Sequence, residues 1–172
     1  NKLQELETGM EWLKMMKNSA AIQAFGAGIN DIEMIPLFLE HFELDFFLVA
    51  MPYTLLNQEP LEDIFPECEK RGIGIIIGSP YASGILATGS CEESKYGYTN
   101  ASEQMRNKVQ SIEKICEAHR IPIKAAALQF PLAHPLVSSV IPGSLSAAQV
   151  LDNIEMLKCP IPSEFWIELK QA

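Results

Sequence analysis

The sequence predicts an α/β fold in which parallel strands alternate with helices. Four short apolar runs are continuous rather than alternating, which is typical of strands buried on both faces of a parallel sheet. Between these runs, apolar residues recur at helical spacing, and the alternation of strands with helices predicts right-handed βαβ units. The chain contains no internal repeat or low-complexity tract, so residues 1–172 are expected to form a single domain.

The first half of the chain predicts an opening helix and then three strands separated by two helices. Apolar residues spaced three and four apart predict an amphipathic helix over 3–17. Asn30 or Asp31 is expected to cap the helix that follows the first strand. The expected strands are 22–28, 46–51 and 74–78, and the helices between them run from 31 to about 41 and from 60 to about 71.

The second half predicts one more strand and four helices. Residues 79–101 form a long polar stretch, which we expect to be a loop suited to ligand contact rather than to core. The remaining expected elements are helices over 102–119 and 123–134, a strand over 138–141, and helices over 146–157 and 162–170.

The overall charge limits the kinds of partner. A net charge of −9 argues against nucleic acids and anionic membranes, because both are bound by clustered Lys and Arg. No apolar run approaches the roughly 20 residues of a membrane span, and residues 1–20 do not resemble a signal peptide, so a cytoplasmic protein is expected. The four cysteines are scattered without metal-ligand spacing, and no metal site is expected.

The segment from Val140 to Asn153 predicts a phosphate site. It joins a short apolar strand to a helix through a Pro-Gly-Ser turn at Gly143 and Ser144. Such a turn presents unpaired backbone N–H groups and the positive end of the helix dipole to an anion. The side chains placed one to two helical turns further on are expected to reach beyond the phosphate to a base or a sugar: they are Gln149, Asp152 and Asn153.

An ordered series of short motifs resembles the aldo-keto reductase family, and most closely its aldose 1-dehydrogenase branch, which includes fucose, threo-aldose and pyridoxal dehydrogenases. The resemblance runs from about Glu7 to the C-terminus, and the series is specific although each piece alone is weak. The matching motifs are Phe25-Gly26-Ala27-Gly28-Ile29-Asn30, Tyr53-Thr54-Leu55-Leu56, Ser83-Gly84-Ile85-Leu86, Ala127-Leu128-Gln129-Phe130-Pro131 and Ile141-Pro142-Gly143-Ser144.

The resemblance implies that the chain is the C-terminal half of a (βα)8 TIM barrel, its last four βα units. The catalytic tetrad of Asp, Tyr, Lys and His in that family comes from the first four strands and the loops beside them, so this chain is expected to contain no catalytic residue and to be inactive alone. Completing the barrel would require the missing N-terminal half or a second copy of the chain. A barrel opened after four strands exposes sheet edges and apolar faces, which are unfavourable in water.

The resemblance also implies a nicotinamide cofactor. Gly143 and Ser144 match the turn that holds the phosphate on the adenosine side, and Asp152 and Asn153 match the pair that approaches adenine. Because Gly143 and Gln149 stand where NADPH-using relatives place Lys and Arg, NAD is expected, with NADP also possible.

Two further parts of the cofactor site follow from the same resemblance. Ser79, Ser83 and Gly84 match the loop over the pyrophosphate. Asn30 resembles the residue that binds the nicotinamide carboxamide, although it is also a candidate helix cap.

The expected function is therefore hydride transfer between nicotinamide and a small aldehyde, alcohol or sugar. Two alternatives remain open at this point. One is a non-catalytic NAD-binding or scaffold half barrel. The other is a phosphate-binding isomerase or lyase domain, since half barrels of this pattern hold phosphosugars at the same turn.

Overall fold

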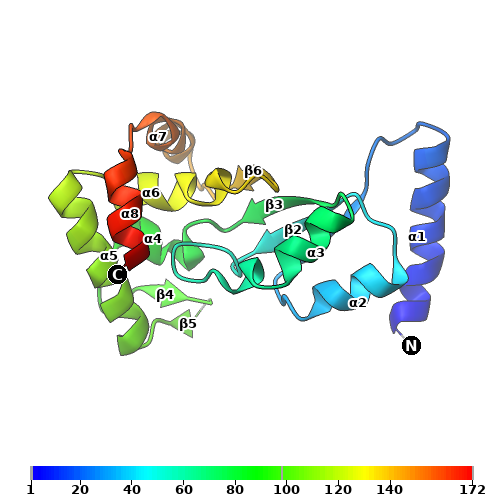
Figure 1. Ribbon diagram of the computed structural model, residues 1–172, viewed down its shortest axis with the longest axis horizontal. Coiled ribbons are helices and arrows are strands. Elements are labelled where there is room, and N and C mark those ends of the chain that lie inside the picture. The colour runs from blue at the N-terminus through cyan, green and yellow to red at the C-terminus, as the bar shows by residue number, and fades with distance from the viewer. Residues whose placement is uncertain (1, 98, 172) are drawn as a thin grey trace.

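The computed structural model describes residues 2–97 and 99–171, and it contains the parallel sheet that the sequence predicts. Four strands form this sheet in the order β1-β2-β3-β6, and every neighbouring pair is parallel. In Figure 1 the sheet lies in the middle of an elongated molecule, with helix α1 at one end and helices α5 and α8 at the other. The strands are β1 Gly26–Ile29, β2 Phe46–Ala50, β3 Gly74–Gly78 and β6 Val137–Ile141.

Strand β1 is shorter than expected, because pairing begins only where β1 meets the start of β2. The Asp45 carboxylate accepts a hydrogen bond of 2.9 Å from the Phe25 N–H, and the Asp45 N–H donates to the Phe25 carbonyl over 3.0 Å. Lys17 forms an ion pair with the same carboxylate. Residues 22–24 precede this junction and lie outside the ladder.

Helices α2 and α3 cover one face of the sheet. Side chains of Phe47, Val49, Ile75 and Ile77 on that face are fully buried. Their neighbours on the opposite face, such as Leu48, are only half-buried. The expectation that these strands are buried on both faces is therefore wrong for the described part of the chain. The helices of this half are α1 Lys2–Asn18, α2 Met34–His41 and α3 Ile64–Lys70, with a short 3-10 turn η1 at Glu59–Leu61.

The prediction that Asn30 or Asp31 caps α2 is wrong. The helix begins at Met34, and its N-cap position is Glu33, which makes no side-chain cap. Asp31 instead accepts a hydrogen bond of 3.2 Å from the Glu33 N–H, which forms a local turn before the helix.

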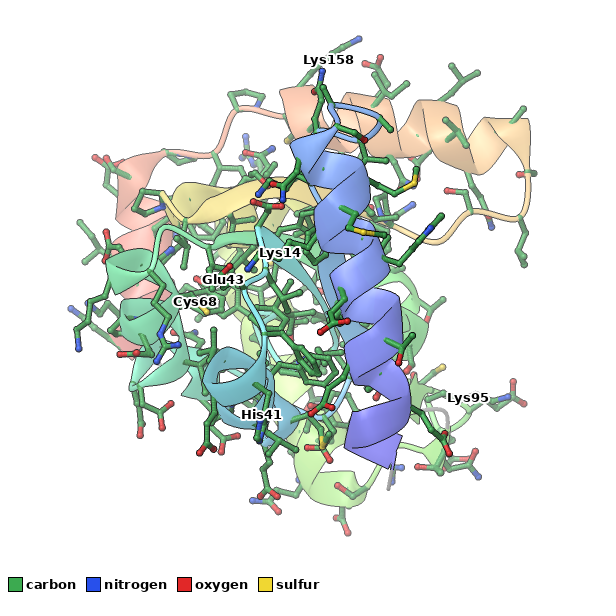
Figure 2. All side chains as sticks on the ribbon, turned by 90° about the vertical axis from the view of Figure 1, so that its right-hand side faces the viewer. Lys14, His41, Glu43, Cys68, Lys95 and Lys158 are labelled. Carbon is green, nitrogen blue, oxygen red and sulfur yellow. The ribbon has the colours of Figure 1, made fainter. Side chains whose placement is uncertain are left out.

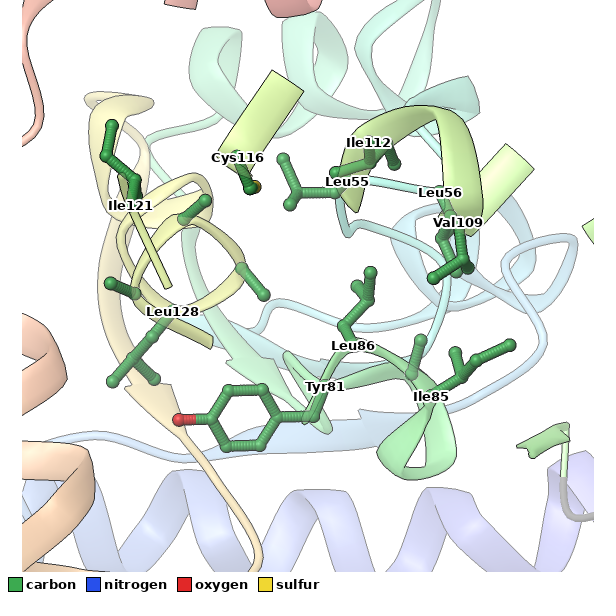
Figure 3. Close-up of a cluster of buried hydrophobic side chains, with 14 of the residues drawn as sticks. Leu55, Leu56, Tyr81, Ile85, Leu86, Val109, Ile112, Cys116, Ile121 and Leu128 are labelled. Atoms are coloured by element: carbon green, nitrogen blue, oxygen red, sulfur yellow. The ribbon is translucent and has the colours of Figure 1, made fainter. Parts of the chain in front are cut away.

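The segment over 79–101 is not a simple polar loop. It contains a 3-10 turn, a short helix and a two-stranded hairpin, and Tyr81, Ile85 and Leu86 are buried in a second hydrophobic cluster (Figure 3). Helices α5 and α6 supply the other walls of this cluster, together with Phe165 from the last helix. The elements of this half are η2 Ala82–Gly84, α4 Ile85–Thr88, β4 Lys95–Tyr96, β5 Thr99–Asn100, α5 Glu103–His119, α6 Ile123–Gln129, η3 Pro131–Ala133, α7 Ala147–Lys158 and α8 Ser163–Gln171.

Helix α1 packs loosely against the rest of the molecule. Met10 and Leu13 pack against the hydrophobic cluster that the sheet forms with α2 and α3. Leu6 and Trp12 on the same helix are exposed. An ion pair of 2.6 Å joins Lys14 to Glu43 (Figure 2). No helix within the described residues is both long enough and apolar enough to cross a membrane.

Candidate functional site

The candidate site lies at the carboxyl ends of β3 and β6, where two connections meet. Gly78 and Ile141 are paired in register, so the segments that follow these two residues leave the sheet side by side. Carboxyl ends of parallel strands are where ligands bind in such folds. A pocket of about 320 Å³ opens between the connections, near the lower end of the range of roughly 300–1,000 Å³ for small-molecule sites. Its walls are Ser79, Tyr81, Ser83, Gly84, Ala87, Thr88, Lys124, Gly143, Leu145, Gln149 and Asn153.

The connection after β3 has an unusual backbone. Ser79, Ala82 and Ser83 have φ angles of 51°, 49° and 61°, in the left-handed region that non-glycine residues rarely adopt. Each such residue costs of order 1 kcal/mol or more and persists only where its surroundings enforce it. Here the buried Tyr81 side chain anchors the loop, and the Tyr81 carbonyl accepts a hydrogen bond of 2.9 Å from the Gly84 N–H. The loop therefore presents its polar groups in one fixed arrangement.

The connection after β6 ends in a capped helix. Ser146 is the N-cap of α7, and its hydroxyl accepts a hydrogen bond of 3.3 Å from the Gln149 N–H. The Gln149 side chain reaches back, and its Oε1 accepts from the Leu145 N–H over 2.6 Å. The arrangement resembles a capping box, except that the Gln149 side chain reaches the N–H of the residue before the N-cap rather than that of Ser146. Gln149 thus lies on the pocket wall with its carbonyl oxygen already engaged.

Asn153 joins the two connections. Its side chain is buried, and its Oδ1 accepts a hydrogen bond of 2.7 Å from the Tyr81 hydroxyl. Its Nδ2 donates to the Ser144 hydroxyl over 3.0 Å. Figure 3 shows the Tyr81 ring at the edge of the second cluster, with its hydroxyl directed away from Leu86. Burial, with a smaller contribution from Asp152, raises the pKa of Tyr81 to about 12, so the hydroxyl remains a donor at neutral pH.

Lys124 is the single charged side chain among the described residues of the pocket wall. It forms an ion pair with Asp152, and its ammonium lies 5.7 Å from the centre of the Tyr81 ring. Lys124 is not among the residues that the sequence predicts for the site. A signal was present, because Lys124 lies in the first turn of α6, where the helix dipole disfavours a cation.

The structure brings most of the predicted site residues together. Those that form part of the pocket wall are Ser79, Ser83, Gly84, Gly143, Gln149 and Asn153. Ser144 and Asp152 lie one contact away, through Asn153 and Lys124. Asn30 is not among them: it is exposed at the end of β1, and β2 and β3 separate that strand from β6.

A larger cavity of about 830 Å³ lies at the opposite end of the sheet. Its walls come from α1, α2 and the residues just before the strands, such as Phe25, Leu44 and Ile73. Because functional sites of parallel α/β folds lie at the carboxyl ends of the strands, we take the smaller pocket as the candidate site.

Metal ligands do not cluster in the described part of the chain. Over residues 2–97 and 99–171, no group of three or more His, Cys, Asp or Glu side chains is placed to hold a metal ion. Cys68 and Cys116 are buried free thiols, and burial raises the pKa of each to about 11.

Nearly the whole length of this chain matches known proteins. A family model described as the aldo/keto reductase family matches residues 2–172. Pyridoxal 4-dehydrogenase of Microbacterium luteolum is 35% identical over 162 residues, which are 94% of this chain and 47% of that protein. D-threo-aldose 1-dehydrogenase of a Pseudomonas species is 32% identical over 161 residues, 93% of this chain and 49% of that protein. The chain therefore spans about half the length of these curated relatives.

Solved structures show the same fold. The apo form of an aldo-keto reductase from Bacillus halodurans superimposes with a TM-score of 0.75 at 21% identity, covering 96% of this chain and 56% of that one. The holo form of the same enzyme gives a TM-score of 0.73 at 20% identity, with 96% and 55% covered. The expected fold, part of a (βα)8 barrel, is confirmed, as is the resemblance to the aldose dehydrogenase branch. The chain belongs to the aldo/keto reductase family of oxidoreductases.

Proposed function

We propose that this chain supplies the cofactor-binding half of an enzyme that transfers hydride between a nicotinamide dinucleotide and a small carbonyl compound, alcohol or sugar. The observation that carries the proposal is the pocket between the connections after β3 and β6, which the hydrogen bonds of Asn153 to Tyr81 and to Ser144 hold together. The names of the relatives support the substrate class, since they act on pyridoxal and on D-threo-aldoses.

The residues of the pocket fit the adenosine and phosphate part of such a cofactor. Among the described wall residues, the polar side chains are hydroxyls, two amides and one ammonium, and no carboxylate lines the wall. Gly143 has open space where a side chain would start, so a ligand can approach the backbone there. When bound, the dinucleotide would supply or accept the hydride.

Each predicted residue receives a role under this proposal. Ser79, Ser83 and Gly84 hold the pyrophosphate, Gly143 and Ser144 hold the adenosine-side phosphate, and Gln149, Asp152 and Asn153 form the surroundings of the adenosine. Asn30 is exposed at the carboxyl end of β1, at the opposite edge of the sheet from β6, and it binds the nicotinamide carboxamide there. NAD is the expected cofactor, because neither Gly143 nor Gln149 brings a cation.

The catalytic Asp, Tyr, Lys and His lie outside this chain in the proposal. Within the described residues, β1 and β6 each pair with a single strand, and Leu48 and Ile76 on the face opposite α2 and α3 are half-buried. A further barrel half, from the same polypeptide or from a second copy, would cover that face and complete the enzyme. Residues 1–172 alone are expected to be inactive, and a cytoplasmic location stays a prediction.

Calorimetry on the complete polypeptide tests the proposal. NAD, ADP-ribose and a sugar phosphate are titrated separately, and NAD-dependent oxidation of small aldoses and of pyridoxal is assayed in parallel. We expect NAD and ADP-ribose to bind, sugar phosphate not to bind, and turnover to occur. Dinucleotide binding without turnover of any aldehyde or sugar would favour a scaffold. Binding of sugar phosphate but not of dinucleotide would favour an isomerase or lyase.

A further inference from the structure

The one cation on the described pocket wall, Lys124, forms an ion pair with Asp152. Lys124 lines the pocket wall, with its side chain 26% exposed, whereas Asp152 is not among the wall residues and its side chain is 43% exposed. The ammonium contacts the carboxylate on one side and the face of the Tyr81 ring on another. The cation at the pocket wall is therefore already balanced by a carboxylate.

The two partners come from different elements, so the pair depends on how those elements pack. Lys124 lies at the start of α6 and Asp152 in the middle of α7, and these helices contact one another. The other polar side chains around the pair, Tyr81, Gln149 and Asn153, are neutral and hydrogen-bonded to protein groups. Changing one partner of the pair therefore changes the local charge by one unit while leaving the neutral groups in place.

We propose that Asp152 sets the preference of this site for NAD(H) over NADP(H) by neutralising Lys124. This inference rests on the proposed function, because it assumes that the pocket takes the adenosine end of a dinucleotide. A 2′-phosphate adds up to two negative charges, and here it would meet a cation that is already paired with a carboxylate. A 2′-hydroxyl carries no charge and is accepted by a neutral site. Asp152 acts through Lys124 and is a specificity-determining residue.

The decisive variant is Asp152→Asn, which keeps the shape of the side chain and removes its charge. It leaves Lys124 free to pair with a 2′-phosphate. We expect the ratio of the NADP to the NAD dissociation constant to fall about tenfold, equivalent to gaining one charge-assisted hydrogen bond. AMP and adenosine 2′,5′-bisphosphate, which differ by one phosphate, should show the same change in isothermal titration of the complete polypeptide.

Two further variants make the test specific. Lys124→Gln removes the cation and should raise the ratio of the NADP to the NAD dissociation constant. The double variant, with Asp152→Asn and Lys124→Gln together, should return this ratio close to that of the unchanged protein. The matched control is Glu155→Gln, which removes the same charge three residues away on α7, in an exposed ion pair of 2.9 Å with Lys158. Thermal unfolding of every variant confirms that it is folded.

The possible outcomes separate this inference from the proposed function. If Asp152→Asn changes the ratio no more than Glu155→Gln does, or strengthens NAD and NADP binding equally, the role of the pair is overturned while the dinucleotide site stands. If the unchanged protein binds neither dinucleotide nor AMP, the proposed function fails, and the role of the pair fails with it.

Discussion

Tyr81 belongs to both the core and the candidate site, because its ring and its hydroxyl have different surroundings. The ring packs with Leu86 and Leu128 in the second hydrophobic cluster, and the hydroxyl donates to Asn153. A tyrosine is suited to this position, since a buried aromatic ring contributes packing while its polar end needs one partner. The sequence places Tyr81 in a long polar stretch, and its hydrogen bond to Asn153 spans 72 positions, which no local pattern reveals.

Replacing Tyr81 with phenylalanine should weaken the fold without changing its shape. The variant leaves the buried Oδ1 of Asn153 without its donor, so we expect the free energy of unfolding to fall by about 1–3 kcal/mol. Urea denaturation followed by circular dichroism measures this difference. Tyr96→Phe serves as the control, because Tyr96 takes no part in the hydrogen bonds of Asn153 to Tyr81 and Ser144. Equal losses for the two variants would contradict the assigned role of the Tyr81 hydroxyl.

The same hydroxyl gives a specific pH dependence. Burial raises the pKa of Tyr81 from an ordinary 10.0 to about 12, so the unfolded chain loses this proton first. The stability that Tyr81 contributes is complete below pH 10 and is lost as the pH rises toward 12. Cys68 and Cys116 act in the same direction from pH 9, because burial raises the pKa of each from 9.0 to about 11.

Comparison with Tyr81→Phe isolates the tyrosine contribution, because both thiols remain in the variant. Between pH 10 and 12, we expect the unfolding free energy of the unchanged protein to fall more steeply than that of Tyr81→Phe. Parallel curves over this range would show that the Tyr81 hydroxyl ionises normally in the folded state.

At the scale of elements, helix α7 depends on the capping contacts of Ser146 and Gln149. Ser146 and Gln149 together satisfy the N–H groups of Leu145 and of Gln149 itself. Ser146→Ala should therefore cost about 0.5–2 kcal/mol and speed amide hydrogen exchange in the first turn of α7. Ser111→Ala is the matched control, because Ser111 lies inside α5, where alanine is the better helix former. If Ser146→Ala lowers the free energy of unfolding no more than Ser111→Ala does, the Ser146 cap contributes nothing to stability.

The elements show which parts of the molecule the sequence predicts well. Strands β2 and β3 lie where their apolar runs placed them, because a continuous run of Phe, Ile, Leu or Val has few other low-energy arrangements. Helix α4 was missed, since its single turn, with buried Ile85 and Leu86, is too short to show a period. The Ser146-x-x-Gln149 pattern is also typical of a helix N-terminus, and Gln149 contributes to that N-terminus as well as to the pocket wall. The ion pair of Lys124 with Asp152 depends on helix packing, which local sequence does not encode.

At the scale of the whole molecule, the sheet remains open at both edges in the described part of the chain. The face that carries Leu48 and Ile76 is half-buried, and α7 exposes Val150, Leu151 and Leu157. Contiguous exposed apolar surface and unpaired strand edges favour association. Residues 1–172 produced alone should therefore self-associate and bind the dye ANS, as sedimentation velocity and fluorescence can establish. The complete polypeptide serves as the control. If residues 1–172 alone are monomeric, do not bind ANS and unfold cooperatively, the interpretation as half of a barrel is contradicted.

The pairing of β3 with β6 has a consequence for the order of folding. The two strands are neighbours in the sheet, but the connection between them carries α4, α5 and α6. Closing a long connection costs chain entropy, so we expect β6 to join the sheet late. The pocket is made of residues from both sides of this junction, and it exists only after β6 has docked. If the pocket binds a dinucleotide as proposed, binding would report that β6 has docked, and a chain stalled before this step would bind none.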